Sequence, residues 1–331
     1  MLTNQKPIGS GFGAASTTSD VMSGIDLTGK TAIVTGGYSG LGLETVRAFQ
    51  AGGANVIVPT RNKESAARAL NALDNIEIEY MDLLDPASID AFADKFMSSG
   101  RALHILVNSA GIMAVPELTL DDRGFEAHFA TNHLGHFQLT SGLLPALRQA
   151  NGARVVSVSA RAHQLSRVVF DDIHFKQREY RPMLGYAQSK TANILFAAGL
   201  DAREKHNGIR AFSLHPGSII TNLGRNFTRE QMQSFGVLDE QGHPVIDPEK
   251  QYKTVEQGAA TQVWCATNPE LVDLGGVYCE NVEVAPLISL DGDNDTEDIQ
   301  STRLPGVMPY AVDPEEADRL WELSQRLVFG R

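Results

Sequence analysis

Cysteine is scarce in this sequence. Only Cys265 and Cys279 occur, and neither belongs to a CxxC pair or lies beside a histidine-rich tract. Disulfide frameworks and structural zinc sites need several cysteines at short spacings, so both are excluded. We expect two small buried thiols in a protein of the reducing cytoplasm, and no metal site.

Long apolar runs and an excess of positive charge are also missing. No stretch approaches the roughly 18 apolar residues that a membrane-spanning helix needs, so we expect no membrane span. The 40 acidic residues outnumber the 28 lysines and arginines, which gives a net charge of −12. A chain with this charge repels nucleic acid, and we expect no nucleic-acid partner.

Hydrophobic residues make up 42% of the 331 residues, which is enough for a large core. From residue 30 on, short apolar runs alternate with longer amphipathic stretches. The runs, which we interpret as strands, cover 31–35, 54–59, 76–81, 103–108, 153–159, 209–214 and 275–280. Helical patterns lie at 41–52, 62–73, 86–98, 121–150, 185–206 and 255–267. Continuous Val, Ile and Leu runs that alternate with helices predict a Rossmann-type doubly wound α/β fold, a parallel sheet of about seven strands covered on both faces.

No linker rich in proline and glycine interrupts this alternation, so we expect a single domain over residues 25–331. Residues 1–24 are rich in Gly, Ser and Thr and predict an irregular arm. Residues 222–254 break the rhythm and are predicted to form a substrate lid, because long loops in compact α/β domains are usually functional. We expect the acids of the loop 286–312 to face water, and the stretch 314–328, with acids in its first turn, to form a closing helix.

The glycine-rich turn after the first strand predicts a phosphate site. Thr35 is followed by the residues GGYSGLG, which open a helix. Glycines there let main-chain N–H groups and the positive end of the helix dipole approach a pyrophosphate. The cofactor contacts expected in this turn are Gly36, Tyr38, Ser39, Gly40 and Leu41. A second cluster, Gly9, Gly11 and Gly13, is followed by neither a strand nor a helix, so we expect no phosphate there.

The T-G-x-x-x-G-x-G turn resembles that of the short-chain dehydrogenase/reductase family. Further motifs of the family follow in order, with Asn108-Ser109-Ala110-Gly111 after the fourth strand and Tyr186-x-x-x-Lys190 on a helix. The segments NHLGHF, FDDIHF and YAQSKTANILF make the chain most similar to the branch of retinol dehydrogenases and WW-domain oxidoreductases. The resemblance covers residues 25–330 and implies an oxidoreductase that uses NAD(H) or NADP(H) to interconvert an alcohol and a ketone or aldehyde.

The second strand ends with Thr60-Arg61, where an NAD-preferring member carries an acid. A guanidinium suits a 2′-phosphate, so we predict NADP(H) in preference to NAD(H). The other cofactor contacts that the resemblance implies are Asp82, Leu83, Asn108, Ala110, Gly111, Tyr186, Lys190, Pro216, Gly217, Ile219 and Thr221.

Tyr186 and Lys190 are four residues apart and share one face of a helix. An ammonium beside a phenol lowers the pKa of the phenol, which predicts Tyr186 as a general acid or base near neutral pH. By the resemblance, Tyr186 protonates the carbonyl oxygen during reduction, Lys190 holds ribose hydroxyls and Asn132 holds a water of the proton relay. We interpret His133 and His136, which flank Asn132, as helix packing residues.

One family motif is incomplete. Members closest to this pattern read V-S-x-S-S-x-x-H at the end of the fifth strand, and the second serine of the pair binds the substrate oxygen; this chain has Ala160 there. Neighbouring side chains of a strand point to opposite faces, so Ser159 cannot simply replace it. We expect Ala160, His163 and Tyr186 to face the substrate. Three interpretations stay open: an impaired natural form, an engineered alanine, or a local twist that lets Ser159 or His163 reach the oxygen.

The sequence thus predicts an NADP(H)-dependent oxidoreductase for an apolar, fairly bulky small molecule. Apolar residues on segments expected near the lid support this, namely Val115, Leu184, Leu223, Phe227, Phe235 and Val237. One alternative is an NADP-binding sensor or scaffold with little turnover, which Ala160 favours. Another is an epimerase or dehydratase on the same scaffold. Family members often pair two long helices across a two-fold axis, which implies a homodimer or homotetramer.

Overall fold

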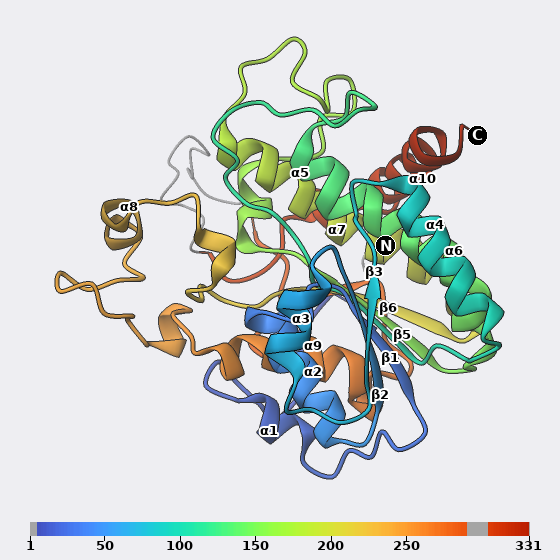
Figure 1. The fold of residues 1–331 in the computed structure, drawn as a ribbon. Helices are drawn as coiled ribbons and strands as arrows, with labels where there is room; N and C mark the ends of the chain where they lie inside the picture. The colour runs from blue at the N-terminus through green and yellow to red at the C-terminus, as the bar shows by residue number, and fades with distance from the viewer. Residues whose placement is uncertain (1–4, 290–303, 331) are drawn as a thin grey trace.

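A single sheet forms the centre of the protein in the computed structural model, which describes residues 5–289 and 304–330 (Figure 1). The strand order is β3-β2-β1-β4-β5-β6-β7-β8, and every pair is parallel except β7 with β8. The strands are β1 Thr31–Val34, β2 Asn55–Thr60, β3 Ile76–Tyr80, β4 Ile105–Asn108, β5 Ala153–Val158, β6 Ile209–His215, β7 Val277–Glu280 and β8 Glu283–Val284. The predicted fold class is confirmed, and the strand that the sequence analysis missed, β8, is only two residues long.

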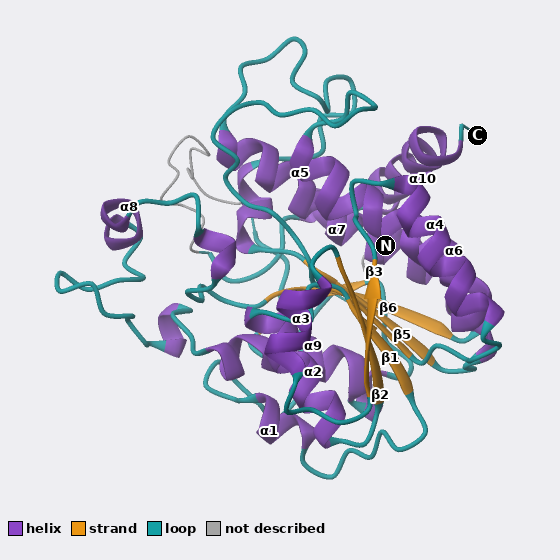
Figure 2. Ribbon diagram, in the orientation of Figure 1, coloured by secondary structure: helices purple, strands orange, loops and turns teal. Residues whose placement is uncertain are grey.

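Helices cover both faces of the sheet (Figure 2). On one face lie α2 Gly40–Ala51, α3 Lys63–Leu70 and α9 Val255–Thr267, with α1 Thr18–Met22 packed on α9. On the other lie α4 Pro86–Ser98, α6 Gly135–Gln149, α7 Pro182–Glu204 and α10 Pro314–Phe329. In β1, Ile33 enters one core while Ala32 and Val34 enter the other, and all three are fully buried. Two-sided burial therefore explains why the strands are apolar without interruption.

The long helix predicted at 121–150 begins later than expected. The Glu126 carboxylate accepts hydrogen bonds from the N–H groups of His128 and Phe129, and this side-chain cap starts α5 at Ala127–Phe129. A π-helical turn, Ala130–Leu134, then joins α5 to α6. Turns of this kind insert an extra residue and are frequent at functional sites.

The N-terminal arm is more ordered than an irregular segment, because Thr17 and Asp20 form a capping box that starts α1. Further upstream, the N–H groups of Ile8, Gly9 and Ser10 each donate to the Glu283 carboxylate at 2.8 Å. Residues 8–10, which include Gly9 of the N-terminal glycine cluster, therefore bind a carboxylate of the protein itself and attach the arm to β8.

The segment 222–254 extends away from the sheet and contains the short helix α8 Arg229–Ser234 (Figure 1). Of the predicted acidic loop 286–312, residues 290–303 lie outside the described part of the chain. The closing helix expected at 314–328 corresponds to α10, which ends at Phe329. No helix in the described ranges is long and apolar enough to cross a membrane.

Candidate active site

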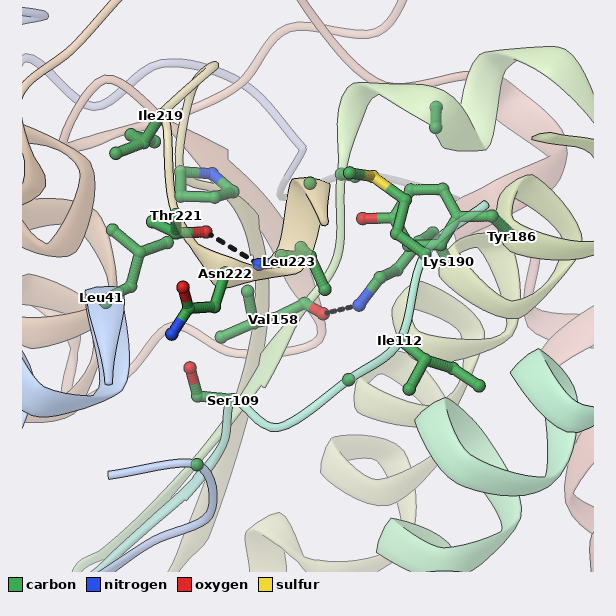
Figure 3. Close-up of a pocket in the computed structure, with 18 of the residues that line it drawn as sticks. Leu41, Ser109, Ile112, Val158, Tyr186, Lys190, Ile219, Thr221, Asn222 and Leu223 are labelled. Atoms are coloured by element: carbon green, nitrogen blue, oxygen red, sulfur yellow. Dashed lines mark hydrogen bonds between the residues drawn. The ribbon is translucent and has the colours of Figure 1, made fainter. Parts of the chain in front are cut away.

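A cleft of about 1480 Å³ opens at the carboxyl ends of the parallel strands (Figure 3). Most of the predicted site residues lie on its wall: Gly36, Tyr38, Ser39, Gly40, Leu41, Arg61, Asp82, Leu83, Ala110, Gly111, Ala160, Tyr186, Lys190, Pro216, Gly217, Ile219 and Thr221. Three predicted residues, Asn108, Asn132 and His163, are buried behind this wall instead. The fold therefore gathers predicted residues from seven separate segments of the chain into one cleft, as expected for ligand sites of doubly wound sheets.

The glycine turn brings backbone close to the cleft. Gly36 has φ +68°, and a Cβ there would lie 3.0 Å from the Cα of Ala110. Gly40 has φ +51°, and its Cβ would lie 3.1 Å from Thr221. Ser39, the N-cap of α2, forms no side-chain cap, and the first turn of α2 carries no acid. The free N–H groups and positive helix end thus face the cleft without an internal anion.

Thr35 is a site residue that the sequence analysis did not single out. Its Oγ1 accepts hydrogen bonds from the N–H groups of Ser109 and Ala110 and contacts Nε2 of His136 at 2.9 Å. The His136 Nδ1 lies 3.0 Å from the carbonyl oxygen of Asn132. Burial lowers the pKa of His136 to about 4, so the ring is neutral and can donate from Nδ1 while it accepts from Thr35. His136 therefore links the glycine turn to Asn132 and does more than pack the helix.

His133 is a packing residue, as the sequence predicted. Its ring lies against Phe129, Phe137 and Phe196, and its Nε2 is 2.7 Å from Oγ of Ser324. Burial lowers its pKa to about 3, so the ring stays neutral at physiological pH.

Asn132 and Asn108 form hydrogen bonds that connect the loop and the helices around the cleft. The Asn132 side chain accepts from the N–H of Ile112 at 2.9 Å and donates to its carbonyl at 3.0 Å, which fixes the loop after β4. It also donates to Oγ of Ser189 on α7. Asn108 donates to Oγ1 of Thr140 at 3.2 Å and is 1% exposed, so its visible role is to join β4 to α6.

Arg61 and Asp82 form the rim of the cleft at its β2–β3 end. The Arg61 guanidinium is 62% exposed and its Nη1 lies 3.8 Å from the Asp82 carboxylate. The side chain of Thr60 is buried, and its Oγ1 accepts from the N–H of Asn62. A long guanidinium on the rim is free to turn toward a bound phosphate, because an exposed ion pair at this distance is weak.

Tyr186 and Lys190 lie together at the other end of the cleft (Figure 3). The Lys190 Nζ donates to the carbonyl of Val158 at 2.9 Å and lies 5.5 Å from the centroid of the Tyr186 ring. Both residues are 4% exposed. Burial lowers the pKa of Lys190 to about 7 and raises the pKa of Tyr186 above its ordinary value near 10. The expected lowering of the tyrosine pKa is therefore wrong for this geometry, because burial of the phenol disfavours its charged form and raises the pKa.

Ala160 faces the cleft in an extended conformation, with φ −158° and ψ 159°. The hydroxyl of Ser159 donates to the carbonyl of Lys190 at 2.7 Å, so it is engaged inside the protein. His163 is fully buried; its Nδ1 lies 2.9 Å from the Ala160 carbonyl and its Nε2 accepts from the N–H of Met308. The expectation that His163 faces the substrate is not met, because both ring nitrogens form hydrogen bonds with backbone groups. A local twist that frees Ser159 or His163 is absent from the described residues.

The segment 222–254 forms part of the cleft wall and contributes apolar side chains to it, beside polar ones such as Arg225, Glu249 and Lys250. Of the apolar residues expected near the lid, Leu223, Phe227, Phe235 and Val237 line the cleft, whereas Val115 and Leu184 do not. Four methionines that the sequence analysis missed, Met81, Met113, Met183 and Met232, line it as well. No group of three or more potential metal-ligating side chains occurs in the part of the chain that the structure describes.

One hydrogen bond ties segment 222–254 to the loop after β4, from Nδ2 of Asn226 to the carbonyl of Met113 at 2.8 Å. Asn132 holds this loop at Ile112, and Nε2 of His128 accepts from the N–H of Val115. The segment therefore rests on a loop that is held on both sides of the contact.

Sequence comparisons agree with the site geometry. Residues 30–232 match the family model for short chain dehydrogenases. A "Probable oxidoreductase" of Streptomyces lividans is 46% identical over 90% of this chain and 97% of its own length. Retinol dehydrogenase 11 of Mus musculus is 36% identical over 82% of this chain and 84% of its own. The WW domain-containing oxidoreductase of Danio rerio is 34% identical over 94% of this chain and 71% of its own.

Among solved structures, that of an uncharacterized protein from Mycobacterium paratuberculosis is similar, with a TM-score of 0.69 and 30% identity. The match covers 95% of this chain and 97% of the other. The resemblance to the branch of retinol dehydrogenases and WW-domain oxidoreductases is thereby confirmed.

Proposed function

The chain belongs to the short-chain dehydrogenase/reductase family of oxidoreductases, and from this premise we propose that it interconverts an alcohol and a ketone or aldehyde with NADP(H). The observation that carries the proposal is the position of Tyr186, whose side chain reaches the same cleft as the glycine turn. Among the described residues its hydroxyl has no hydrogen-bond partner, so it is available to a substrate oxygen.

The cleft fits a nicotinamide dinucleotide. The uncapped start of α2, with Gly36 and Gly40 where a Cβ would crowd the turn, suits a pyrophosphate. Arg61 suits a 2′-phosphate on the rim, and Lys190 lies where it can hold ribose hydroxyls. A tenfold or greater preference for NADH over NADPH, measured as the ratio of KM values, would contradict the choice of cofactor.

When bound, the reduced nicotinamide supplies the hydride for the carbonyl carbon. The residues of this chain position the carbonyl and supply the proton. The Tyr186 hydroxyl, protonated at neutral pH because burial raises its pKa, donates its proton to the oxygen that becomes the alcohol. Lys190, bound to the Val158 carbonyl, is placed to return a proton to Tyr186 through water, and Asn132 positions the neighbouring loop through its hydrogen bonds with Ile112.

We propose an apolar, fairly bulky substrate and a lid formed by the segment 222–254. Leu223, Phe227 and Phe235 of this segment line the cleft beside Met183 of α7. Methionine side chains adapt to irregular apolar shapes, which suits a substrate with few polar groups. The contact from Asn226 to Met113 is the one that would close the lid over it.

Ala160 supports a second candidate function, a dinucleotide-binding sensor or scaffold with little turnover. Ser159 and His163 are both engaged elsewhere, so neither of them supplies the hydroxyl that Ala160 lacks. The trio of Tyr186, Lys190 and Asn132 favours an enzyme, since binding alone does not require it.

One assay separates these candidates. Purified protein is mixed with NADPH and a panel of apolar ketones and aldehydes, and the loss of NADPH absorbance is followed. We expect slow, substrate-dependent loss. Tight NADPH binding with no loss on any substrate would favour the sensor, and conversion of a substrate without net loss of NADPH would favour an epimerase or dehydratase.

We further propose a cytoplasmic protein that forms a homodimer or homotetramer. Both cysteines, Cys265 and Cys279, are buried free thiols, which agrees with a reducing compartment. Light scattering coupled to size-exclusion chromatography measures the assembly, and a monomer at micromolar concentration would contradict the second part of the proposal.

A further inference from the structure

Thr131 is a buried polar residue of the cleft with no role in the contacts described above. It lies on the cleft wall, it is 9% exposed, and its hydroxyl has no hydrogen-bond partner among the described residues. Buried hydroxyl groups nearly always have a partner, because an unpaired one has lost its water without compensation. The unpaired Thr131 hydroxyl therefore indicates that a ligand group completes this part of the wall.

The residues around Thr131 show at which end of the cleft it lies. Thr131 belongs to the π-helical turn Ala130–Leu134. One turn later, Gly135 packs so closely on the loop after β3 that a Cβ there would lie 2.9 Å from the Cβ of Leu83. Residues four apart share a helix face, so Thr131 points to the same region as Gly135. The next residue, Asn132, binds Ile112 toward the Tyr186 end.

We propose that the Thr131 hydroxyl forms a hydrogen bond with the adenosine half of the bound dinucleotide. The partner is an oxygen of the adenosine ribose or of its attached phosphates, since a hydroxyl can donate to or accept from either kind of group. Leu83 follows Asp82, which faces Arg61 on the rim, and the pyrophosphate belongs at the start of α2. The adenosine half therefore lies on the Thr131 side of the cleft. This inference rests on the proposed function for the presence of a dinucleotide.

If only a ligand forms a hydrogen bond with the Thr131 hydroxyl, removing this hydroxyl has opposite effects on the stability of the free protein and on that of the complex. Replacing threonine by valine keeps the branched shape and removes the hydroxyl. In the free protein, this change removes an unpaired polar group and raises the thermal stability. In the complex, it removes a hydrogen bond and weakens binding. A merely structural hydroxyl would show the reverse effect on stability and none on binding.

The test measures dissociation constants of the full chain for NADPH and for 2′,5′-ADP, which carries only the adenosine half, together with the melting temperature of the free protein. For Thr131→Val we expect a dissociation constant roughly three- to tenfold higher for both ligands, and a melting temperature about 1–3 °C higher. Thr131→Ser keeps the hydroxyl and should bind within about twofold of the wild type. Thr131→Ala provides a second variant without the hydroxyl and should weaken binding to a similar extent.

Thr261→Val is the matched control. Thr261 is fully buried on α9, and its Oγ1 accepts from the N–H of Val282 at 3.1 Å. This variant should melt at a lower temperature and bind both ligands normally. Unchanged binding in Thr131→Val and Thr131→Ala would overturn the contact, and weaker binding of NADPH but not of 2′,5′-ADP would overturn its placement. A wild-type protein that binds no dinucleotide would instead refute the proposed function and the contact with it.

Discussion

Replacing Ala160 with serine should raise turnover substantially. The position lies on the cleft wall with φ −158° and ψ 159°, an extended conformation that serine adopts without strain. The change adds one hydroxyl where the family places a donor to the substrate oxygen. Removing one such preorganised donor typically costs about 10²- to 10³-fold in rate, or about 2.7–4 kcal/mol of barrier. We therefore expect kcat of Ala160→Ser to rise by about two orders of magnitude with a smaller change in KM.

The assay is the initial rate of NADPH consumption on the best ketone or aldehyde of the panel. Ala162→Ser places a hydroxyl on the same wall two residues further along and should leave kcat unchanged. Ser159→Ala removes the hydrogen bond to the Lys190 carbonyl. This variant should have a lower melting temperature and a nearly unchanged kcat. No gain in Ala160→Ser, or complete loss of activity in Ser159→Ala, would show that another group already stabilises the oxygen.

Three further predictions follow from single contacts. Arg61→Gln should raise KM for NADPH about tenfold and leave KM for NADH nearly unchanged; equal effects on both cofactors would contradict a 2′-phosphate contact. Because burial raises the pKa of Tyr186, alcohol oxidation should increase steadily from neutral pH toward pH 10, whereas carbonyl reduction should vary little; a plateau of oxidation near pH 7 would contradict this. Glu283→Gln should speed proteolysis of the N-terminal arm and lower the melting temperature by about 1–3 °C, and an equally resistant arm would show that the three N–H contacts contribute little.

The buried Lys190 also predicts how stability depends on pH. Its pKa is lowered to about 7 in the folded protein from 10.5, so between these values the unfolded chain binds more protons than the folded one. The contribution of Lys190 to the free energy of unfolding must therefore increase as the pH rises from about 7 to 10. Chemical denaturation at several pH values measures this, and Lys190→Met should flatten the profile; an unchanged slope would assign the effect to other groups.

Much of the fold was predictable because parallel strands buried on both faces have a simple pattern. The run at 31–35 became β1, and the pattern at 86–98 matched α4 residue for residue. The start of α5 was not predictable from periodicity, since it depends on the Glu126 cap and a π-helical turn. Strand β8 was missed because a strand of two residues is too short to show a pattern of apolar residues.

The candidate site was predictable where local motifs place residues and less so where tertiary packing decides. The glycine turn and Tyr186 with Lys190 lie on the cleft as their spacing indicated. The predicted direction of the Tyr186 pKa shift was wrong because burial, which sequence spacing does not report, raises the pKa of the phenol. The prediction that His163 faces the substrate was wrong because its hydrogen-bond partner Met308 lies 145 residues away in the sequence.

The central claim is that Tyr186 supplies the proton for carbonyl reduction in this cleft, and Tyr186→Phe tests it most directly. This variant keeps the ring and removes the hydroxyl, the group of Tyr186 that donates the proton. The decisive measurement is the rate of NADPH consumption with the best substrate, compared at equal NADPH occupancy in the wild type and in Tyr186→Phe. We predict that binding of NADPH stays within about threefold while the rate falls by about 10²-fold or more. An undiminished rate in Tyr186→Phe would contradict the account.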